Sequence, residues 1–113
     1  MSLDFSLYAT DVDGNEIYVF GQNVTHNLVK MAGAAGLYKA MWRPEEMDPP
    51  ATKAGELVDA LQAGVAELAT NPSKYRPLSP NNGWGTYKGL LSASQAILEA
   101  CRTYPSAAIH ISR

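Results

Sequence analysis

The chain opens on a regular alternation of apolar and polar residues. The apolar positions are Leu3, Phe5, Leu7 and Ala9. Alternation with a period of two predicts a half-buried strand. Asp13-Gly14 then predicts a tight hairpin turn, because both positions tolerate positive φ. The run 16–20 predicts the second strand of this hairpin, and residues 21–23 are expected to release the chain from the sheet.

Later segments carry apolar residues at helical spacing instead. The predicted helices cover residues 28–35, about 52–70 and about 86–103, with one further helical turn at 37–42. Gly36 is typical of a left-handed cap at the end of the first of these helices. Pro72 and Pro105 are expected to end the other two. Residues 107–111 form a short apolar run, which predicts a last strand.

This order of elements, β-β-α-α-α-β, predicts an α+β fold. We expect a small three-stranded sheet with three helices packed on one face. A chain of 113 residues corresponds to one domain, residues 1–113. Residues 72–85 are expected to form a long irregular connection, and long loops inside compact domains are often functional.

Composition narrows the class of protein. Hydrophobic residues make up 46% of the chain and charged residues 18%, which is typical of a globular domain. The N-terminus has neither the basic region nor the apolar run of a signal peptide. No stretch approaches the roughly 20 apolar residues that a membrane span needs. We therefore expect a cytoplasmic protein with no membrane partner.

The charge pattern argues against nucleic acid as a partner. The formal net charge is −2, and the nine Lys and Arg residues are scattered along the chain. Binding to the phosphate backbone depends on clustered basic side chains. We expect no nucleic-acid partner.

Catalytic and metal-binding patterns are weak. Cys101 falls on the predicted buried face of a helix, where a thiol is usually inert. His26 and His110 are far apart in sequence and have no metal-site spacing. Asp11, Asp13 and Asn15 alternate like calcium ligands, but the glycine stands fourth in the run instead of sixth. We expect a non-enzymatic protein with no metal and no cofactor.

Two polar segments are candidates for binding a small ligand. Thr25, His26 and Asn27 surround a predicted helix start, where free N–H groups favour anions. Simple capping of the helix, with His26 in solvent, is the alternative for this segment. The second segment contains Asn81, Asn82, Trp84 and Tyr87. Its aromatic rings could stack on a ligand, or Trp84 could fold inward over the sheet. If both segments contribute to one site, they must converge around one pocket.

A second hypothesis concerns protein–protein contact. The run from Leu28 to Trp42 contains only two charged residues. Its candidate interface residues are Tyr38, Met41, Trp42 and Met47. Such residues suit a homodimer interface, although methionine and tryptophan at helical spacing more often belong to a core. The interface hypothesis predicts an exposed apolar patch on the monomer.

Several of these motifs together suggest a family. The segments concerned are Thr25-His26-Asn27-Leu28, Trp42-Arg43-Pro44-Glu45-Glu46 and Asn82-Gly83-Trp84-Gly85-Thr86-Tyr87. From about residue 23 onward, the chain resembles a family of small uncharacterised proteins found in bacteriophages and some bacteria. The resemblance implies two roles, which are the withholding of a small host signalling molecule and the binding of a host protein. The residues themselves favour a small polar, nucleotide-like ligand.

Overall fold

The computed structural model describes residues 1–81, 83 and 85–113. The strands are β1 (Ser2–Thr10), β2 (Glu16–Thr25) and β3 (Ala108–Ser112). The α-helices are α1 (Val29–Ala34), α2 (Tyr38–Trp42), α3 (Val58–Thr70), α4 (Pro72–Tyr75) and α5 (Tyr87–Thr103). Short 3₁₀ turns occupy His26–Leu28, Pro44–Glu46, Ala54–Leu57 and Arg76–Leu78.

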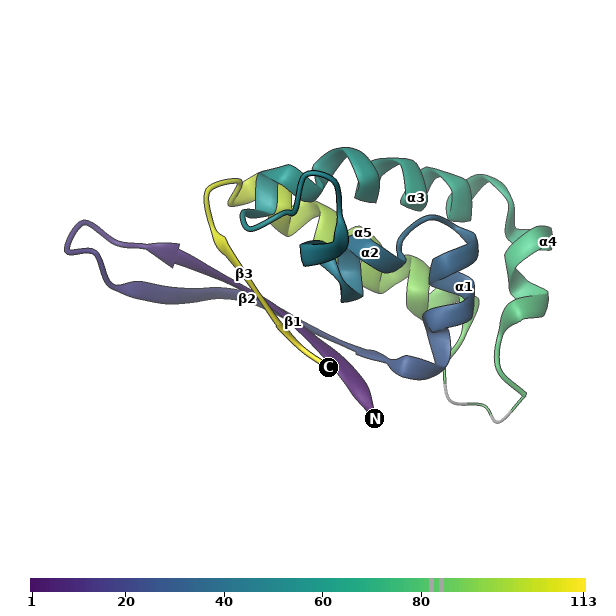
Figure 1. Cartoon of the computed structure of the whole chain (residues 1–113). Coiled ribbons are helices and arrows are strands. Elements are labelled where there is room, and N and C mark those ends of the chain that lie inside the picture. Colours follow the sequence, from purple (N-terminus) through teal and green to yellow (C-terminus); the bar gives the residue numbers. More distant parts are fainter. Residues whose placement is uncertain (82, 84) are drawn as a thin grey trace.

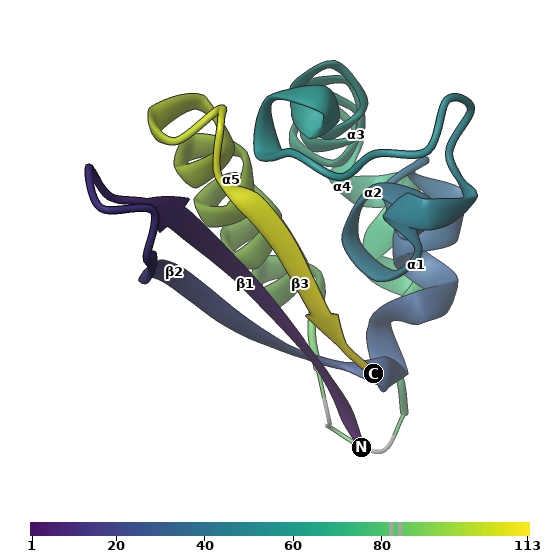
Figure 2. The ribbon, with the colours of Figure 1, turned by 60° about the vertical axis from the view of Figure 1, so that its left-hand side comes forward.

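The sheet is antiparallel, with β1 in the centre and the order β2-β1-β3. Its inner face is apolar because the alternation of β1 buries Leu3, Phe5 and Leu7 completely. The helices all lie on this side of the sheet, as Figure 1 shows. The opposite face carries the polar positions of β1 and faces away from the helices (Figure 2). The predicted α+β class and its order of elements are confirmed.

Strand β2 continues past the point where the sequence suggested that it would end. Gly21 pairs with Ser6, and the ladder runs on to Thr25 opposite Ser2. The ring of Tyr18 covers Gly21, since a Cβ built on that glycine would collide with the Tyr18 hydroxyl group. Aromatic cover of this kind stabilises a glycine within a strand. The expectation that residues 21–23 leave the sheet was therefore wrong.

The segment from residue 72 to residue 85 is more regular than expected. Pro72 begins α4 instead of merely ending α3, because proline is well tolerated in the first turn of a helix. A 3₁₀ turn follows at Arg76–Leu78. Tyr75 at the end of α4 is fully buried, which anchors this connection to the body of the domain.

Helices α3 and α5 pack against each other over the sheet, while α1 and α2 form a bent pair beside them (Figures 1 and 2). Gly36 joins the bent pair with φ +80°, as predicted for a left-handed cap. Leu37 next to it is fully buried. Its side chain packs so closely on Gly64 of α3 that a Cβ built on this glycine would collide with it. The glycine is required for this close contact.

We expect Gly64→Ala to destabilise the protein, although alanine favours a helix. The added methyl group would meet Leu37, and such overpacking costs about 1–3 kcal/mol. Gly33→Ala in α1 is the matched control, because a Cβ there meets nothing within 4 Å. Urea denaturation should show a lower free energy of unfolding for Gly64→Ala alone. Equal stability of the two variants would contradict this account of the packing.

Candidate functional site

The predicted helix start at Thr25–Asn27 is a capped turn. Thr25 ends β2, and its hydroxyl accepts a hydrogen bond from the Asn27 N–H at 3.3 Å. The His26 N–H donates across the sheet to the Met1 carbonyl at 3.2 Å. The turn leads into a helix of only six residues, so its dipole is short. Capping accounts for this segment without an anion.

His26 lies against the core instead of in solvent. Its ring centroid is 6.4 Å from that of Trp42, and its Nε2 atom is buried. Within the described part of the chain, neither His26 Nε2 nor Trp42 Nε1 has a hydrogen-bond partner. The expectation of a solvated His26, which accompanied the capping alternative, was therefore wrong.

Of the predicted binding residues that the structure describes, only Thr25 lies where the two polar segments approach each other. A groove of about 440 Å³ runs between β2 and α5, and we call it the β2–α5 groove. Its lining residues are Gln22, Asn23, Val24, Thr25, Leu28, Gly85, Thr86, Gly89, Ser92 and Ala93. Thr25 and Gly85 face each other there, since a Cβ on Gly85 would lie 2.9 Å from Thr25 Cγ2. His26, Asn27 and Asn81 are not among the lining residues.

The proposed aromatic residues do not form a platform in this groove. Tyr87 is only 5% exposed, and its hydroxyl donates to the Leu68 carbonyl inside the core. Its predicted stacking role is therefore wrong, because the ring is enclosed between α3 and α5. Asn82 and Trp84 lie outside the described residues.

The proposed interface residues fall into two groups, one inside the core and one packed against it. Met41 is fully buried and Trp42 is 2% exposed, so both belong to the core. Tyr38 and Met47 are half-buried and pack against it. Tyr38 stacks on Trp42 with ring centroids 6.0 Å apart and planes inclined by 16°. The expected apolar patch on the monomer fails at Met41 and Trp42, because α2 packs against β1.

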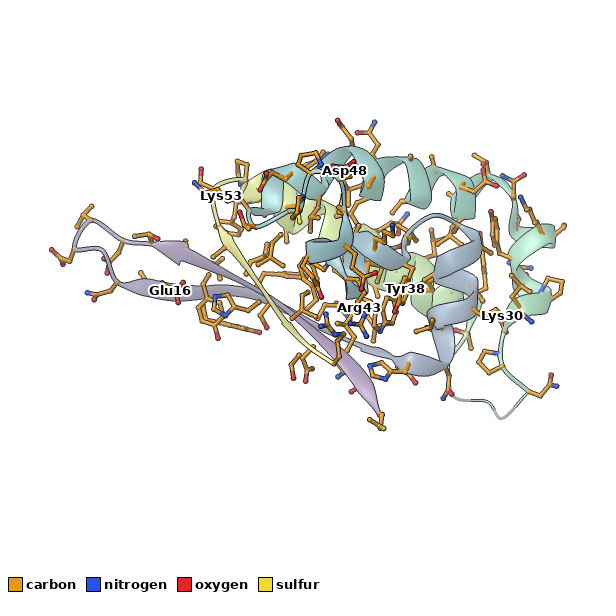
Figure 3. The ribbon with its side chains drawn as sticks, in the orientation of Figure 1. Glu16, Lys30, Tyr38, Arg43, Asp48 and Lys53 are labelled. Carbon is orange, nitrogen blue, oxygen red and sulfur yellow. The ribbon has the colours of Figure 1, made fainter. Side chains whose placement is uncertain are left out.

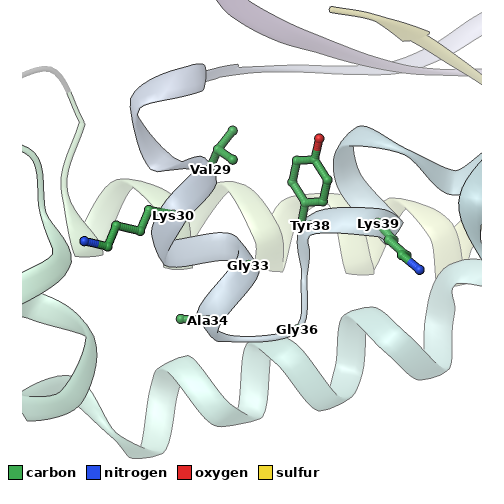
Figure 4. Close-up of a pocket in the computed structure, with 7 residues that line it drawn as sticks. All are labelled: Val29, Lys30, Gly33, Ala34, Gly36, Tyr38 and Lys39. Carbon is green, nitrogen blue, oxygen red and sulfur yellow. The ribbon is translucent and has the colours of Figure 1, made fainter.

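A second groove lies between α1 and α2, and the sequence analysis did not identify it (Figure 4). We call it the α1–α2 groove. It has a volume of about 510 Å³ and is lined by Val29, Lys30, Gly33, Ala34, Gly36, Tyr38 and Lys39. Gly33 and Gly36 leave it open, because a Cβ on either meets nothing within 4 Å. The side chains of Lys30 and Lys39 extend to opposite sides of it.

The bend between the two helices holds this groove open. The Leu37 N–H donates to the Ala32 carbonyl at 2.8 Å, and the Gly36 N–H to the Gly33 carbonyl at 3.2 Å. Beneath the groove, the Tyr75 hydroxyl lies 3.5 Å from the Ala34 carbonyl and donates to Glu67 Oε1 at 2.7 Å. The floor is therefore connected to both α3 and α4.

The segment that forms the α1–α2 groove is basic in sequence, and Arg43 Nε at its end lies 3.8 Å from Glu46 Oε2. Residues 29–43 contain Lys30, Lys39 and Arg43 but no Asp or Glu. Arg43 Nε donates to the Tyr38 hydroxyl at 3.4 Å, and this hydrogen bond raises the pKa of Arg43. Figure 3 shows Arg43 and Tyr38 close together beside the groove. In the sequence, this basic character was visible only in the fact that Lys30 and Lys39 are the only charged residues between Leu28 and Trp42.

Other reactive groups do not gather in the described part of the chain. Burial raises the pKa of the Cys101 thiol to about 12, so it stays protonated near neutral pH. Among the described residues, no three His, Cys, Asp or Glu side chains lie close enough together to hold a metal ion. No described helix has both the length and the apolar character to cross a membrane.

Comparison with protein-family models, with curated proteins and with solved structures finds no match to this chain. The arrangement of its own residues is therefore the basis for assigning a function.

We expect the contribution of the Tyr75–Glu67 hydrogen bond to depend on pH. Hydrogen bonds from Tyr75 and Lys74 hold the pKa of Glu67 below its ordinary value of 4.5. They stabilise the folded state above that value, and the stabilisation is lost as the pH falls through the lower folded-state pKa. Tyr75→Phe should therefore differ most from the wild type near neutral pH, and the difference should narrow in acid.

Urea denaturation of both proteins between about pH 7 and about pH 3 measures this difference. Glu67→Gln is the control, since it removes the titrating group. In the Glu67→Gln background, the effect of Tyr75→Phe on the free energy of unfolding should be independent of pH. A wild-type difference that stays constant across the range would contradict the assignment.

Proposed function

We propose that the protein binds a small anionic ligand with a flat apolar part in the α1–α2 groove. The observation that carries this proposal is the composition of the groove. Its floor is apolar, Lys30 and Lys39 flank it, and none of its lining residues is acidic. A concave apolar surface with a few well-placed polar groups is typical of small-molecule sites.

The groove fits such a ligand in size and chemistry. Its volume of about 510 Å³ lies within the range of sites for cofactors and other small molecules. Tyr38 offers an aromatic wall, which suits a planar ring. The lysine ammonium groups attract a phosphate or carboxylate as point charges. A nucleotide combines a planar base with phosphate, and we take it as the ligand class.

The β2–α5 groove supports this function less well. It is smaller, at about 440 Å³, and no charged side chain lines it. Thr25 and Thr86 supply hydroxyl groups there, but the Thr86 hydroxyl is already bonded to the Gly89 N–H. It therefore lacks a charge that would hold an anion.

The resemblance to bacteriophage proteins gives this binding a biological use. A small non-enzymatic domain that binds a nucleotide would withhold a signalling molecule from the host. This use rests on the resemblance, whereas the binding proposal rests on the groove.

We expect adenosine 5′-monophosphate to bind and adenosine to bind more weakly, because only the former has a phosphate for Lys30 and Lys39. An exposed charge pair is worth up to about 1 kcal/mol. The double variant Lys30→Ala with Lys39→Ala should therefore weaken binding of the monophosphate by roughly 5- to 30-fold. Its affinity for adenosine should change little. Isothermal titration calorimetry measures the affinities, and amide chemical shifts locate the site.

Lys88→Ala is the matched control, because Lys88 is an exposed lysine at the start of α5 that does not line the groove. It should leave the affinity unchanged. Equal weakening by Lys88→Ala would show a nonspecific effect of charge. Chemical-shift changes confined to Thr25 and Gly85 would place the ligand in the β2–α5 groove and contradict the proposal.

A further inference from the structure

Strand β2 forms an open edge of the sheet. The His26 N–H donates to Met1 across the sheet, and N–H groups alternate in direction along a strand. The backbone groups of Thr25, Asn23 and Gly21 therefore face away from β1. A bulge opposite Leu7 and Tyr8 shifts the register of the strand pair. Beyond it, the Asp11 N–H donates to the Asn15 carbonyl. By the same alternation, the backbone groups of Glu16 and Tyr18 face away from β1.

Apart from the bulge opposite Leu7 and Tyr8, few of the usual protections are present along this edge. Strand β2 has 10 residues and contains no lysine, arginine or proline, which are common protections of edge strands. Among the described residues, one hydrogen bond at its outer backbone comes from a side chain of the same strand. Gln22 Nε2 donates to the Asn23 carbonyl at 3.1 Å. Gly21 and Asn23 are exposed. A second strand can therefore pair along this edge.

The surface beside the edge suits an extended chain. On one side, α5 contributes Gly89, Ser92 and Ala93 to the β2–α5 groove, and these small residues leave room for a backbone. At the other end, the hairpin exposes large apolar side chains. Val12 is fully exposed, Ile17 is 48% exposed and Tyr18 is 58% exposed. The groove lies along the C-terminal part of β2, and these exposed apolar side chains lie toward its N-terminal end and in the turn before it.

The charge of the β1–β2 hairpin indicates which kind of partner this edge binds. Residues 1–29 contain four acidic residues, Asp4, Asp11, Asp13 and Glu16, and no Lys or Arg. In an antiparallel pair of two copies the acidic hairpins would lie at opposite ends, and β2 of the second copy carries no lysine or arginine to face the hairpin carboxylates. Like charges placed together oppose association, and opposite charges favour it. A basic partner fits this edge better than a second copy does.

We propose that the outer edge of β2 binds an extended segment of a basic protein, which adds a strand to the sheet. Backbone hydrogen bonds to Tyr18, Gly21 and Asn23 would hold the segment. Its Lys or Arg side chains would face the acidic hairpin near Asp13 and near Glu16, whose Oε1 lies 3.5 Å from His110 Nε2. Figure 3 shows Glu16 on the hairpin, far from Lys30 of the α1–α2 groove, so this surface is separate from the proposed ligand site.

The test compares two substitutions at one residue. Asn23→Pro removes the outward N–H, whereas Asn23→Ala keeps it. Both variants lose the side-chain hydrogen bonds from Asn23 to Ser2 Oγ and Asp4 Oδ1, each 2.8 Å long. Any loss of binding in the proline variant beyond that in the alanine variant therefore reports the backbone contact. Circular dichroism and thermal unfolding verify that both variants fold.

The probe is a fluorescent peptide of alternating lysine and valine, as long as the 10 residues of β2, followed by anisotropy. We expect it to bind the wild type and Asn23→Ala alike, and Asn23→Pro about fivefold or more weakly, the loss expected for one hydrogen bond. The double variant Asp13→Asn with Glu16→Gln should bind the peptide more weakly, and its affinity should depend less on salt. Glu99→Gln on α5 is the charge control and should change neither the affinity for the peptide nor its dependence on salt.

Several results would overturn the proposal. A matched glutamate–valine peptide that binds as tightly would remove the role of charge. Equal affinity of Asn23→Pro and Asn23→Ala, or no binding of the lysine–valine peptide, would remove the strand pairing. A dimer in sedimentation analysis that Asn23→Pro dissociates would assign the edge to a second copy of this chain.

Discussion

The close contact between Leu37 and Gly64 determines how α1 and α2 pack against the rest of the domain. Leu37 is fully buried, and it occupies the space that a side chain at position 64 would need. This contact fixes the bend between α1 and α2 against α3. The bend in turn determines where Gly33 and Tyr38 lie, and these two residues line opposite parts of the α1–α2 groove. A core contact therefore shapes a surface site.

Local signals in the sequence were enough to predict most of the elements. Asp13-Gly14 and Gly36 predicted their turns because positive φ is a local property of glycine, and both glycines adopt it. Helices α1, α3 and α5 followed from their periodicity, whereas α4 lies in a segment that was expected to be irregular. The full length of β2 could not be predicted, because the stability of Gly21 in the strand depends on the ring of Tyr18 above it.

The candidate sites were harder to predict for a related reason. Tyr87 and Trp42 carry aromatic rings in polar or charge-poor segments, so the sequence alone left binding and core roles open. Packing against α3 and β1 places both in the core. No sequence motif marks the α1–α2 groove. The groove is open because the buried Leu37 orients α1 so that one face of this helix stays exposed. Only its two lysines were visible as a signal.

The division of charge along the chain connects the two proposals. Residues 1–29 carry four acidic and no basic side chains of the Lys or Arg type, whereas residues 29–43 carry three basic and no acidic ones. The fold keeps these two regions on different elements, the hairpin and the α1–α2 pair (Figure 1). One small domain thereby presents an acidic hairpin and a groove flanked by two lysines, which suit partners of opposite charge.

Native mass spectrometry detects whether the α1–α2 groove holds a small anion. The protein would be purified gently from the cells that produce it, beside a Gly33→Leu variant. The leucine side chain fills the groove, and the open space around Gly33 allows it without a clash at Cβ. We expect an adduct with the mass of a small anion on the wild type and none on the variant. An adduct of equal occupancy on both proteins, or none on either, would contradict it.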